Sequence, residues 1–218
     1  MPDVGTVGQS WSVVVPVKRL ERAKTRLSVD ASLRRELALA MATDTVAACL
    51  LTRGVVAVVV VTDDELAAPA MRALGARVVA DEPDAGLNPA LVHGAAALAA
   101  EHADCGTVML ASDLPALSPG ALAQLLEQAA NIDVACVADA GGTGTTVLTT
   151  AASISPAPSF GGGSWQRHLD AGATDLTVYA DPRLRRDVDT TADLAAALTL
   201  GCGAATVTVV SAHPDLLA

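Results

Sequence analysis

Apolar and polar positions along the chain predict an alternation of strands and helices. Short β-branched runs such as Val55–Thr62 are typical of strands covered on both faces, whereas the spacing of Leu33, Leu37 and Met41 predicts a helix. The predicted strands are 12–17, 55–62, 77–80, 107–112, 134–138, 145–150 and 176–180. The predicted helices are one from Asp30 or Ser32 to Leu51, a short one ending at Gly75, and 90–103, 119–130, 164–171 and 190–201. This order predicts an α/β doubly wound sheet, and the neighbouring strands around Gly141–Gly144 indicate that it is mixed rather than purely parallel.

Segments outside these elements suggest how the chain is divided. Residues 1–10 are polar and contain glycine, so we expect a flexible leader followed by one domain over 11–218. Asn88-Pro89 and Ser118-Pro119 each place a capping residue before a proline, which predicts a helix start at both points. Residues 151–163 form a loop long enough to indicate function, and the tail from Gly203 is only weakly patterned.

Composition and charge argue against several classes of partner. The 218 residues are 51% hydrophobic and 2% aromatic, with a net charge of -10 and a pI near 4.6. Such an acidic balance argues against binding to nucleic acid or to an anionic membrane. The four cysteines show no C-x-x-C spacing, so we expect reduced thiols in a cytoplasmic protein. No signal peptide opens the chain, the longest apolar stretch (55–61) is too short to span a bilayer, and the four histidines show no zinc spacing.

One basic segment stands out against this acidic background. Five of the 14 lysines and arginines fall within residues 18–26, directly after the first predicted strand. The segment could offer cations to a triphosphate, although it lacks the glycines of a Walker A motif; the alternative is a solvated loop. Gly141–Gly144 could likewise wrap a small anion with backbone N–H groups, or form a plain hairpin turn. Neither this stretch nor Gly201–Gly203 matches the G-x-G-x-x-G fingerprint of a dehydrogenase.

Acidic residues occur where predicted strands end. The apolar run that begins at Val108 stops at Asp113, and Pro115 prevents the strand from continuing. Ligands of open α/β sheets bind outside the carboxyl ends of the strands, so a carboxylate there is placed to hold a metal ion. Asp187 and Asp189 form a second acidic cluster. Three such hard oxygen ligands could seat one or two Mg²⁺ ions against a nucleotide; the alternative is that Asp113 only caps its turn or the next helix.

The order of several short motifs resembles a known enzyme family. The motifs are Val15-Pro16-Val17-Lys18, Ala23-Lys24-Thr25-Arg26-Leu27, Gly86-Leu87-Asn88, Ser112-Asp113-Leu114-Pro115, Gly142-Thr143-Gly144-Thr145, Phe160-Gly161 and Asp187-Val188-Asp189-Thr190. They span residues 12–200 and together resemble the guanylyltransferases of coenzyme F420 biosynthesis, which act on phosphoenolpyruvate or 2-phospho-L-lactate. Ser-Asp-Leu-Pro alone is shared with wider nucleotidyltransferases, so the ordered set carries the resemblance.

The resemblance implies a single-domain, Rossmann-like (GT-A-like) nucleotidyltransferase fold with a mostly parallel mixed sheet. It implies GTP as co-substrate and Mg²⁺, with two ions, as cofactor. The implied residues are Asp113, Asp187 and Asp189 for the metal, Lys18, Lys24, Arg26 and Asn88 for the nucleotide, Thr145, Gly161 and Ser164 for the acid, and Lys24 and Asp113 for catalysis. We expect small-molecule substrates as partners, and a homodimer is compatible with the sequence.

The expected reaction is transfer of GMP from GTP to the phosphate of phosphoenolpyruvate or 2-phospho-L-lactate, with release of pyrophosphate. A phosphate nucleophile is already ionised at pH 7, so metal ions and lysines matter more than a base. The alanine-rich, lysine-poor composition is typical of a GC-rich bacterial genome, where the family more often uses phosphoenolpyruvate. The alternatives are a related nucleotidyltransferase for molybdopterin or a sugar phosphate, a GT-A glycosyltransferase, and a nucleotide-binding subunit without activity. The presence of all three carboxylates and both lysines argues against the last.

Overall fold

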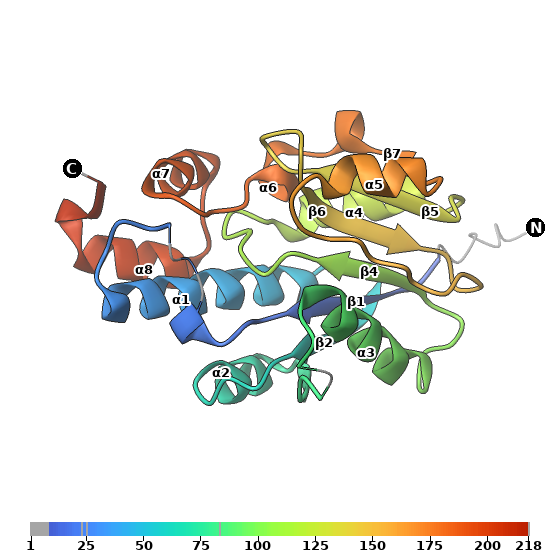
Figure 1. The fold of residues 1–218 in the computed structure, drawn as a ribbon, viewed down its shortest axis with the longest axis horizontal. Helices are drawn as coiled ribbons and strands as arrows, with labels where there is room; N and C mark the ends of the chain where they lie inside the picture. Colours follow the sequence, from blue (N-terminus) through green and yellow to red (C-terminus); the bar gives the residue numbers. More distant parts are fainter. Residues whose placement is uncertain (1–8, 23, 25, 83, 218) are drawn as a thin grey trace, which may run out of the picture.

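The computed structural model describes residues 9–22, 24, 26–82 and 84–217, so most of the expected leader, residues 1–8, lies outside the described part. Its centre is a seven-stranded sheet in the order β3-β2-β1-β4-β6-β5-β7 (Figure 1). The strands are β1 (Trp11–Pro16), β2 (Val55–Val61), β3 (Arg77–Val79), β4 (Gly106–Leu110), β5 (Val134–Ala138), β6 (Thr145–Thr150) and β7 (Thr174–Asp175). The helices are α1 (Ala31–Leu50), α2 (Ala67–Leu74), α3 (Leu87–Ala99), α4 (Pro119–Ala129), α5 (Ser164–Asp170), α6 (Pro182–Arg185), α7 (Thr191–Leu200) and α8 (Ala204–Ala212), with short 3-10 helices at Leu20–Arg22, Thr177–Tyr179 and Pro214–Leu217.

The sheet is mixed and mostly parallel, which confirms the predicted fold class. β1 pairs in parallel with β2 and with β4, and β2 pairs in parallel with β3. β6 runs antiparallel to both β4 and β5, and the short β7 returns to the parallel direction beside β5. The chain therefore moves outward from β1 through β2 and β3 and then crosses to β4 on the other side of β1. The carboxyl ends of β1 and β4 meet where the strand order reverses, which is the position at which open α/β sheets bind ligands.

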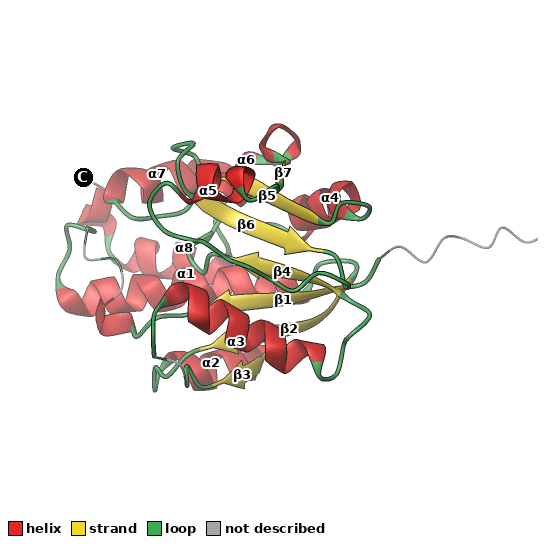
Figure 2. Ribbon diagram, turned by 45° about the vertical axis from the view of Figure 1, so that its right-hand side comes forward, coloured by secondary structure: helices red, strands yellow, loops and turns green. Residues whose placement is uncertain are grey.

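Helices cover both faces of the sheet because successive strand residues point to opposite sides. Val13 and Val15 of β1 belong to a core shared with α1, α2 and α4, whereas Val14 belongs to a core shared with α3. Figure 2 shows α3 in front of β1 and β2 and α1 behind them. Valine, leucine and alanine side chains make up most of both cores, so a core of this size closes with few aromatic side chains.

The C-terminal segment is a further helical layer, not the weakly patterned tail that the sequence suggests. Helix α8 packs along α1 (Figure 1), and Val209 joins a third core that includes Met41. Thr206 is fully buried while Val207 is 42% exposed, so on this helix a polar side chain is buried and an apolar one faces solvent. No apolar stripe marks its buried side, which is why its periodicity is hard to read from the sequence.

The predicted strand 176–180 is wrong. β7 ends at Asp175, and residues 177–179 form a 3-10 helix. At this point the hydroxyl of Thr177 accepts the N–H of Ala138 at 2.9 Å, so a side chain takes the place of the next backbone partner of β5. Val178 is 82% exposed, and the alternating apolar residues that suggested a strand are therefore not a core pattern.

The start of α3 also differs from the expected cap. The helix begins at Leu87 behind Gly86, so Asn88 lies inside its first turn and is not the capping residue. The amide of Asn88 instead accepts the N–H of Phe160 at 2.8 Å and donates to the carbonyl of Phe160 at 3.2 Å. Caps at Asp30, Ser118 and Thr190 are confirmed by their side-chain bonds to the first turns of α1, α4 and α7. None of the helices in the described residues combines the length and the apolar character needed to cross a membrane.

Candidate active site

Asp113 lies on a loop that follows β4 at the switch point of the sheet. Thr45 of α1, which is fully buried, holds this loop on both sides of Asp113. Its hydroxyl accepts the N–H of Leu114 at 3.1 Å and donates to the carbonyls of Met41 at 2.8 Å and Ser112 at 3.3 Å. Helix α1 therefore fixes the backbone of this loop through Thr45. The Asp113 carboxylate stays partly exposed, at 21% of its side-chain surface.

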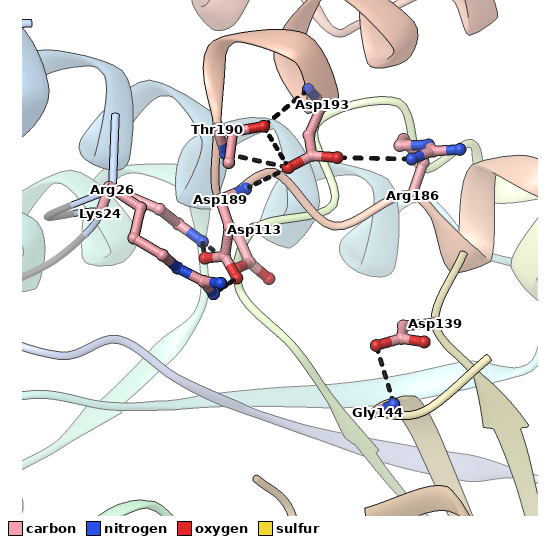
Figure 3. Close-up of polar contacts among 9 residues, drawn as sticks. All are labelled: Lys24, Arg26, Asp113, Asp139, Gly144, Arg186, Asp189, Thr190 and Asp193. Atoms are coloured by element: carbon pink, nitrogen blue, oxygen red, sulfur yellow. Dashed lines mark hydrogen bonds and ion pairs between the residues drawn. The ribbon is translucent and has the colours of Figure 1, made fainter. Parts of the chain in front are cut away.

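The segment of Asp187 and Asp189 lies beside Asp113, but not at the end of a strand as the sequence suggested. They do not follow a strand; they follow the short helix α6, in a segment without regular secondary structure. The N–H of Val188, which is fully buried, donates to the carbonyl of Asp113 at 3.1 Å and joins the two acidic segments directly. Asp193 then accepts the N–H of Asp189 at 3.3 Å as part of the capping box of α7 (Figure 3).

Lys24 links these two acidic segments. Its ammonium contacts Asp113 and lies 3.0 Å from an oxygen of Asp189, which also pairs with the exposed Arg26 (Figure 3). Burial of Lys24 lowers its pKa, but the two carboxylates outweigh that effect and leave the pKa raised, so the ammonium remains charged. Lys24 has a φ of 54°, in the left-handed region that residues other than glycine rarely adopt. Strained backbone of this kind is concentrated at functional sites.

Burial and the neighbouring carboxylates together change the protonation of Asp187. Burial raises the pKa of Asp187 to about 7, with further contributions from Asp113, Asp139 and Asp189 and an opposing one from Lys24. Within the described residues, no three His, Cys, Asp or Glu side chains already surround a common metal position. The donor set nevertheless fits a hard divalent cation, because Mg²⁺ prefers carboxylate oxygens and would neutralise charge that this site holds unfavourably.

Two adjoining cavities open beside these side chains. One, of about 220 Å³, is lined by Lys24, Asp113 and Asp189 and by Lys18, which is exposed. The other, of about 290 Å³, lies at the carboxyl ends of β2 and β3. Their shared lining residues are Pro16, Val17, Lys18 and Leu87. The cleft therefore runs across the end of β1, with Lys24 in one half, the carboxylates Asp63, Asp81 and Asp84 in the other, and Lys18 shared by both.

The residues expected for the acid lie together beyond the other side of β4. Thr145 opens β6, whose pairing continues past β4 through a bond from Ala111 N–H to the carbonyl of Thr146 at 2.9 Å. This places Thr145 beside the loop that carries Asp113. Ser164, at the start of α5, donates to the Thr145 hydroxyl at 3.1 Å. Gly161 has a φ of 123° in the preceding loop, a conformation that favours glycine.

Two site residues were not identified from the sequence. Asp139 accepts the N–H of Gly144 at 2.8 Å (Figure 3) and that of Thr143 at 2.9 Å, so a carboxylate of the chain already occupies amides of the glycine turn. An Asp two residues before a glycine-rich turn is a readable signal for such a bond. His168, buried at 3% exposure, contacts Thr145 at 2.9 Å. Nothing in the spacing of the histidines indicates that contact.

Sequence comparisons identify relatives along nearly the whole chain. Residues 11–210 match the family model described as Guanylyl transferase CofC like. The phosphoenolpyruvate guanylyltransferase of Thermomonospora curvata is 50% identical over 206 residues, which cover 94% of this chain and 90% of that protein. The protein of the same name from Streptomyces coelicolor is 50% identical over 201 residues, which cover 91% of this chain and 95% of that protein.

Solved structures share the fold at much lower sequence identity. A putative nucleotide-diphospho-sugar transferase from Desulfovibrio desulfuricans has a TM-score of 0.69 at 16% identity, covering 95% of this chain and 96% of that one. A nucleotidyl transferase from Methanothermobacter has a TM-score of 0.62 at 22% identity, covering 88% of this chain and 98% of that one. The fold is thus that of the GT-A-like nucleotidyltransferases. Since the family match spans the sheet, both acidic segments and the lysines of the cleft, the chain belongs to the guanylyl transferase CofC-like family.

Proposed function

We propose that this protein transfers GMP from GTP to the phosphate of phosphoenolpyruvate and releases pyrophosphate, as a step of coenzyme F420 biosynthesis. The observation that carries the proposal is the charged Lys24 between Asp113 and Asp189, at the base of a cleft where the strand order reverses. Curated relatives at 50% identity bear the name phosphoenolpyruvate guanylyltransferase, which supports this acceptor over a molybdopterin or a sugar phosphate.

The nucleotide would occupy the two adjoining cavities. Its phosphates suit the half that contains Lys18 and Lys24, which act as positive point charges. Its base suits the half lined by Asp63, Asp81 and Asp84, because carboxylates accept hydrogen bonds and guanine presents N–H donors along one edge. In this arrangement Arg26 and Asn88 act from the border of the cleft. Asn88 would do so by fixing the backbone of the Phe160 loop.

Asp113, Asp187 and Asp189 would hold the divalent cation, and we propose Mg²⁺. When bound, Mg²⁺ would neutralise phosphate charge and make the α-phosphorus of GTP more electrophilic. Thr45 keeps Asp113 in place through the backbone on either side of it, and Asp193 does the same for Asp189. These contacts orient the carboxylates before any ligand arrives, which lowers the reorganisation needed in the transition state.

The reaction itself needs little acid–base chemistry from the protein. A phosphate oxygen of the acid attacks the α-phosphorus in line; a new O–P bond forms while the bond to the β-phosphate oxygen breaks, and pyrophosphate leaves with that electron pair. Thr145, Gly161 and Ser164 would bind the carboxylate of the acid beside Asp113. Lys24, already charged, would stabilise the negative charge that builds up on the phosphates.

Identification of products by mass spectrometry tests this function. The protein is incubated with Mg²⁺, equal concentrations of phosphoenolpyruvate, 2-phospho-L-lactate, 3-phosphoglycerate and a sugar 1-phosphate, and limiting GTP. We expect the guanylylated product of phosphoenolpyruvate to dominate, and 3-phosphoglycerate to fail because its carboxylate and phosphate lie further apart. EDTA should stop the reaction. A dominant sugar or 3-phosphoglycerate product would contradict the proposed acceptor, and full activity in EDTA would contradict the proposed metal.

A matched pair of variants tests whether product formation depends on the cleft. Lys24→Ala removes the buried ammonium, whereas Arg53→Ala removes an exposed cation that pairs with Glu127 near the opposite ends of the strands. We expect Lys24→Ala to lose most product formation and Arg53→Ala to retain it. Equal activity of both variants would show that the lysine between the carboxylates is not part of the active site.

A further inference from the structure

One buried titratable side chain has no part in the reaction described above. His168 lies in α5 at 3% exposure, with its ring edge-on to Phe160 at a centroid distance of 5.5 Å and an interplanar angle of 72°. Both ring nitrogens are engaged. Nε2 is 2.9 Å from the backbone nitrogen of Ser159, and Nδ1 is 2.9 Å from the hydroxyl of Thr145. The ring thus connects the glycine-rich loop to a residue that we assign to acid binding.

These partners determine which nitrogen carries the hydrogen. A backbone N–H only donates, so Nε2 must accept the bond from Ser159. Burial, with the nearby charge of Arg167, lowers the pKa of His168, and the neutral ring has a single N–H. That hydrogen is therefore on Nδ1 and is donated to the oxygen of Thr145.

This donation determines whether the hydroxyls of Thr145 and Ser164 have a hydrogen available for another acceptor. The oxygens of Thr145 and Ser164 are 3.1 Å apart and share one hydrogen bond. Whichever of the two donates within the pair, one hydroxyl hydrogen is left over. Among the described residues, neither hydroxyl donates to any other acceptor. With the opposite tautomer, Thr145 would donate to the ring and the pair would lose the hydrogen that an outside acceptor needs.

The loop next to this pair is held just as firmly. Arg167 donates to the carbonyl of Gly162 at 2.6 Å and to that of Ser159 at 2.7 Å. Asn88 makes two bonds to the backbone of Phe160, and His168 accepts the N–H of Ser159. Gly161, between these anchored residues, is therefore fixed at the same end of α5 as Ser164.

We propose that His168 is a positioning residue that directs the Thr145–Ser164 hydroxyl pair to donate to the carboxylate of the acid substrate. The proposal rests on the proposed function, in which these two residues bind that carboxylate. His168 does not touch the substrate. It acts through Thr145, and through Ser159 it holds the loop that contains Gly161. The spare hydroxyl hydrogen favours an acceptor at that point, and a carboxylate most, because hydrogen bonds to ionised acceptors are stronger than those to neutral ones.

Two substitutions separate the two contacts of the ring. The Asn amide can replace Nδ1 and the Gln amide can replace Nε2, because each places its polar atoms at about the distance of that nitrogen from the backbone. His168→Gln keeps an acceptor for Ser159 but loses the donor to Thr145. We expect it to raise the KM for phosphoenolpyruvate about tenfold, because the two hydroxyls are then no longer oriented toward the acid, with the KM for GTP within about twofold. His168→Asn keeps the donor and should restore much of the affinity for the acid.

A double-mutant cycle with Thr145→Val tests whether His168 acts through Thr145. The isosteric valine removes the hydroxyl, so His168→Gln should add little to the KM for phosphoenolpyruvate in that background. Long-range ¹⁵N–¹H NMR of the ligand-free protein reports the tautomer independently of any substrate. The chain has four histidines, and the resonance absent from His168→Gln identifies this one, for which we expect the Nδ1–H form.

The outcomes distinguish a failure of this inference from a failure of the proposed function. Wild-type protein that makes no product from phosphoenolpyruvate would contradict the function. Wild-type activity combined with an Nε2–H tautomer, with an unchanged KM for the acid in His168→Gln, or with equal increases in both KM values, would overturn the role of His168. Additive effects in the Thr145→Val background would overturn it as well.

Discussion

Replacing Thr45 by valine should disturb the active site from a buried position that does not itself line the cleft. Thr45 is fully buried, and valine has nearly the same shape, so the change removes a hydroxyl without opening a cavity. It leaves the N–H of Leu114 and the carbonyl of Ser112 without the partners they have at 3.1 and 3.3 Å. Both of these groups flank Asp113. The substitution should therefore reduce stability and activity together.

The size of both effects follows from the bonds that are lost. A buried N–H left unsatisfied costs about 1–3 kcal/mol, which for a domain of this length corresponds to a melting temperature lower by about 2–12 °C. If the loop shifts, misplacement of Asp113 by about 1 Å could reduce kcat on the order of 100-fold. Urea unfolding with a fixed m value measures the first effect, and steady-state turnover at saturating substrates measures the second.

Thr43→Val is the matched control. Thr43 lies on the same helix, and its hydroxyl donates only to the carbonyl of Leu39 at 2.8 Å, within α1. We expect its free energy of unfolding to stay within about 0.5 kcal/mol of the wild type and its activity to be unchanged. The reasoning is refuted if Thr45→Val unfolds no earlier than Thr43→Val, or if it is destabilised while kcat stays at the wild-type value.

The remaining predictions concern charges in and near the site. Asp113→Asn and Asp189→Asn should each abolish turnover at saturating Mg²⁺, a loss of about 3 kcal/mol or more in transition-state stabilisation, while circular dichroism shows an intact fold. Lys24→Ala should reduce kcat/KM for GTP more than that for the acid; equal losses would indicate that Lys24 bridges both substrates. His168 has a lowered pKa in the folded state, so the unfolded chain takes up a proton first as the pH falls through about 6.5, and stability is lost below that pH. Urea unfolding at pH 7.5 and 5.5 should show a smaller loss of stability in His168→Gln than in the wild type, and identical losses would show that His168 does not titrate in this way.

Much of the fold could be predicted because its signals are local. The unbroken valine run of β2 and the capping residues Asp30 and Ser118 indicate element type and boundaries without knowledge of any contact. The prediction fails where a distant contact decides the structure. Residues 177–179 look like a strand until the hydroxyl of Thr177 is seen to take the N–H of Ala138. Helix α8 is hard to read because α1, far away in the sequence, determines which side of it is buried.

The candidate site likewise combines residues that local sequence signals indicate with residues whose position depends on distant contacts. Asp113 and the lysines after β1 could be identified, because a charged residue after an apolar strand indicates a ligand site in this class of fold. That Asp187 and Asp189 lie next to Asp113 could not be derived from strand ends, since they follow α6 and not a strand. Their position depends on one backbone bond from Val188 to Asp113. His168 was missed because its role comes from two hydrogen-bond partners and not from a motif.

One turn of α1 forms hydrogen bonds both to the loop of Asp113 and to helix α8. Thr45 fixes the loop of Asp113, and the neighbouring Asp44 accepts the N–H groups of Ala205 and Thr206 at 3.0 and 2.8 Å, which docks the first turn of α8. Gly203, just before that turn, leaves no room for a side chain, since an added Cβ would lie 2.4 Å from the Asp44 carboxylate. Helix α8 follows the segment of Asp187 and Asp189 after one intervening helix, α7, so the chain beyond this segment is anchored on the turn that also fixes the loop of Asp113. Repulsion between the carboxylates favours their separation, and the buried bonds of this turn oppose it, so the site keeps its negative charge concentrated for the cation it is proposed to bind.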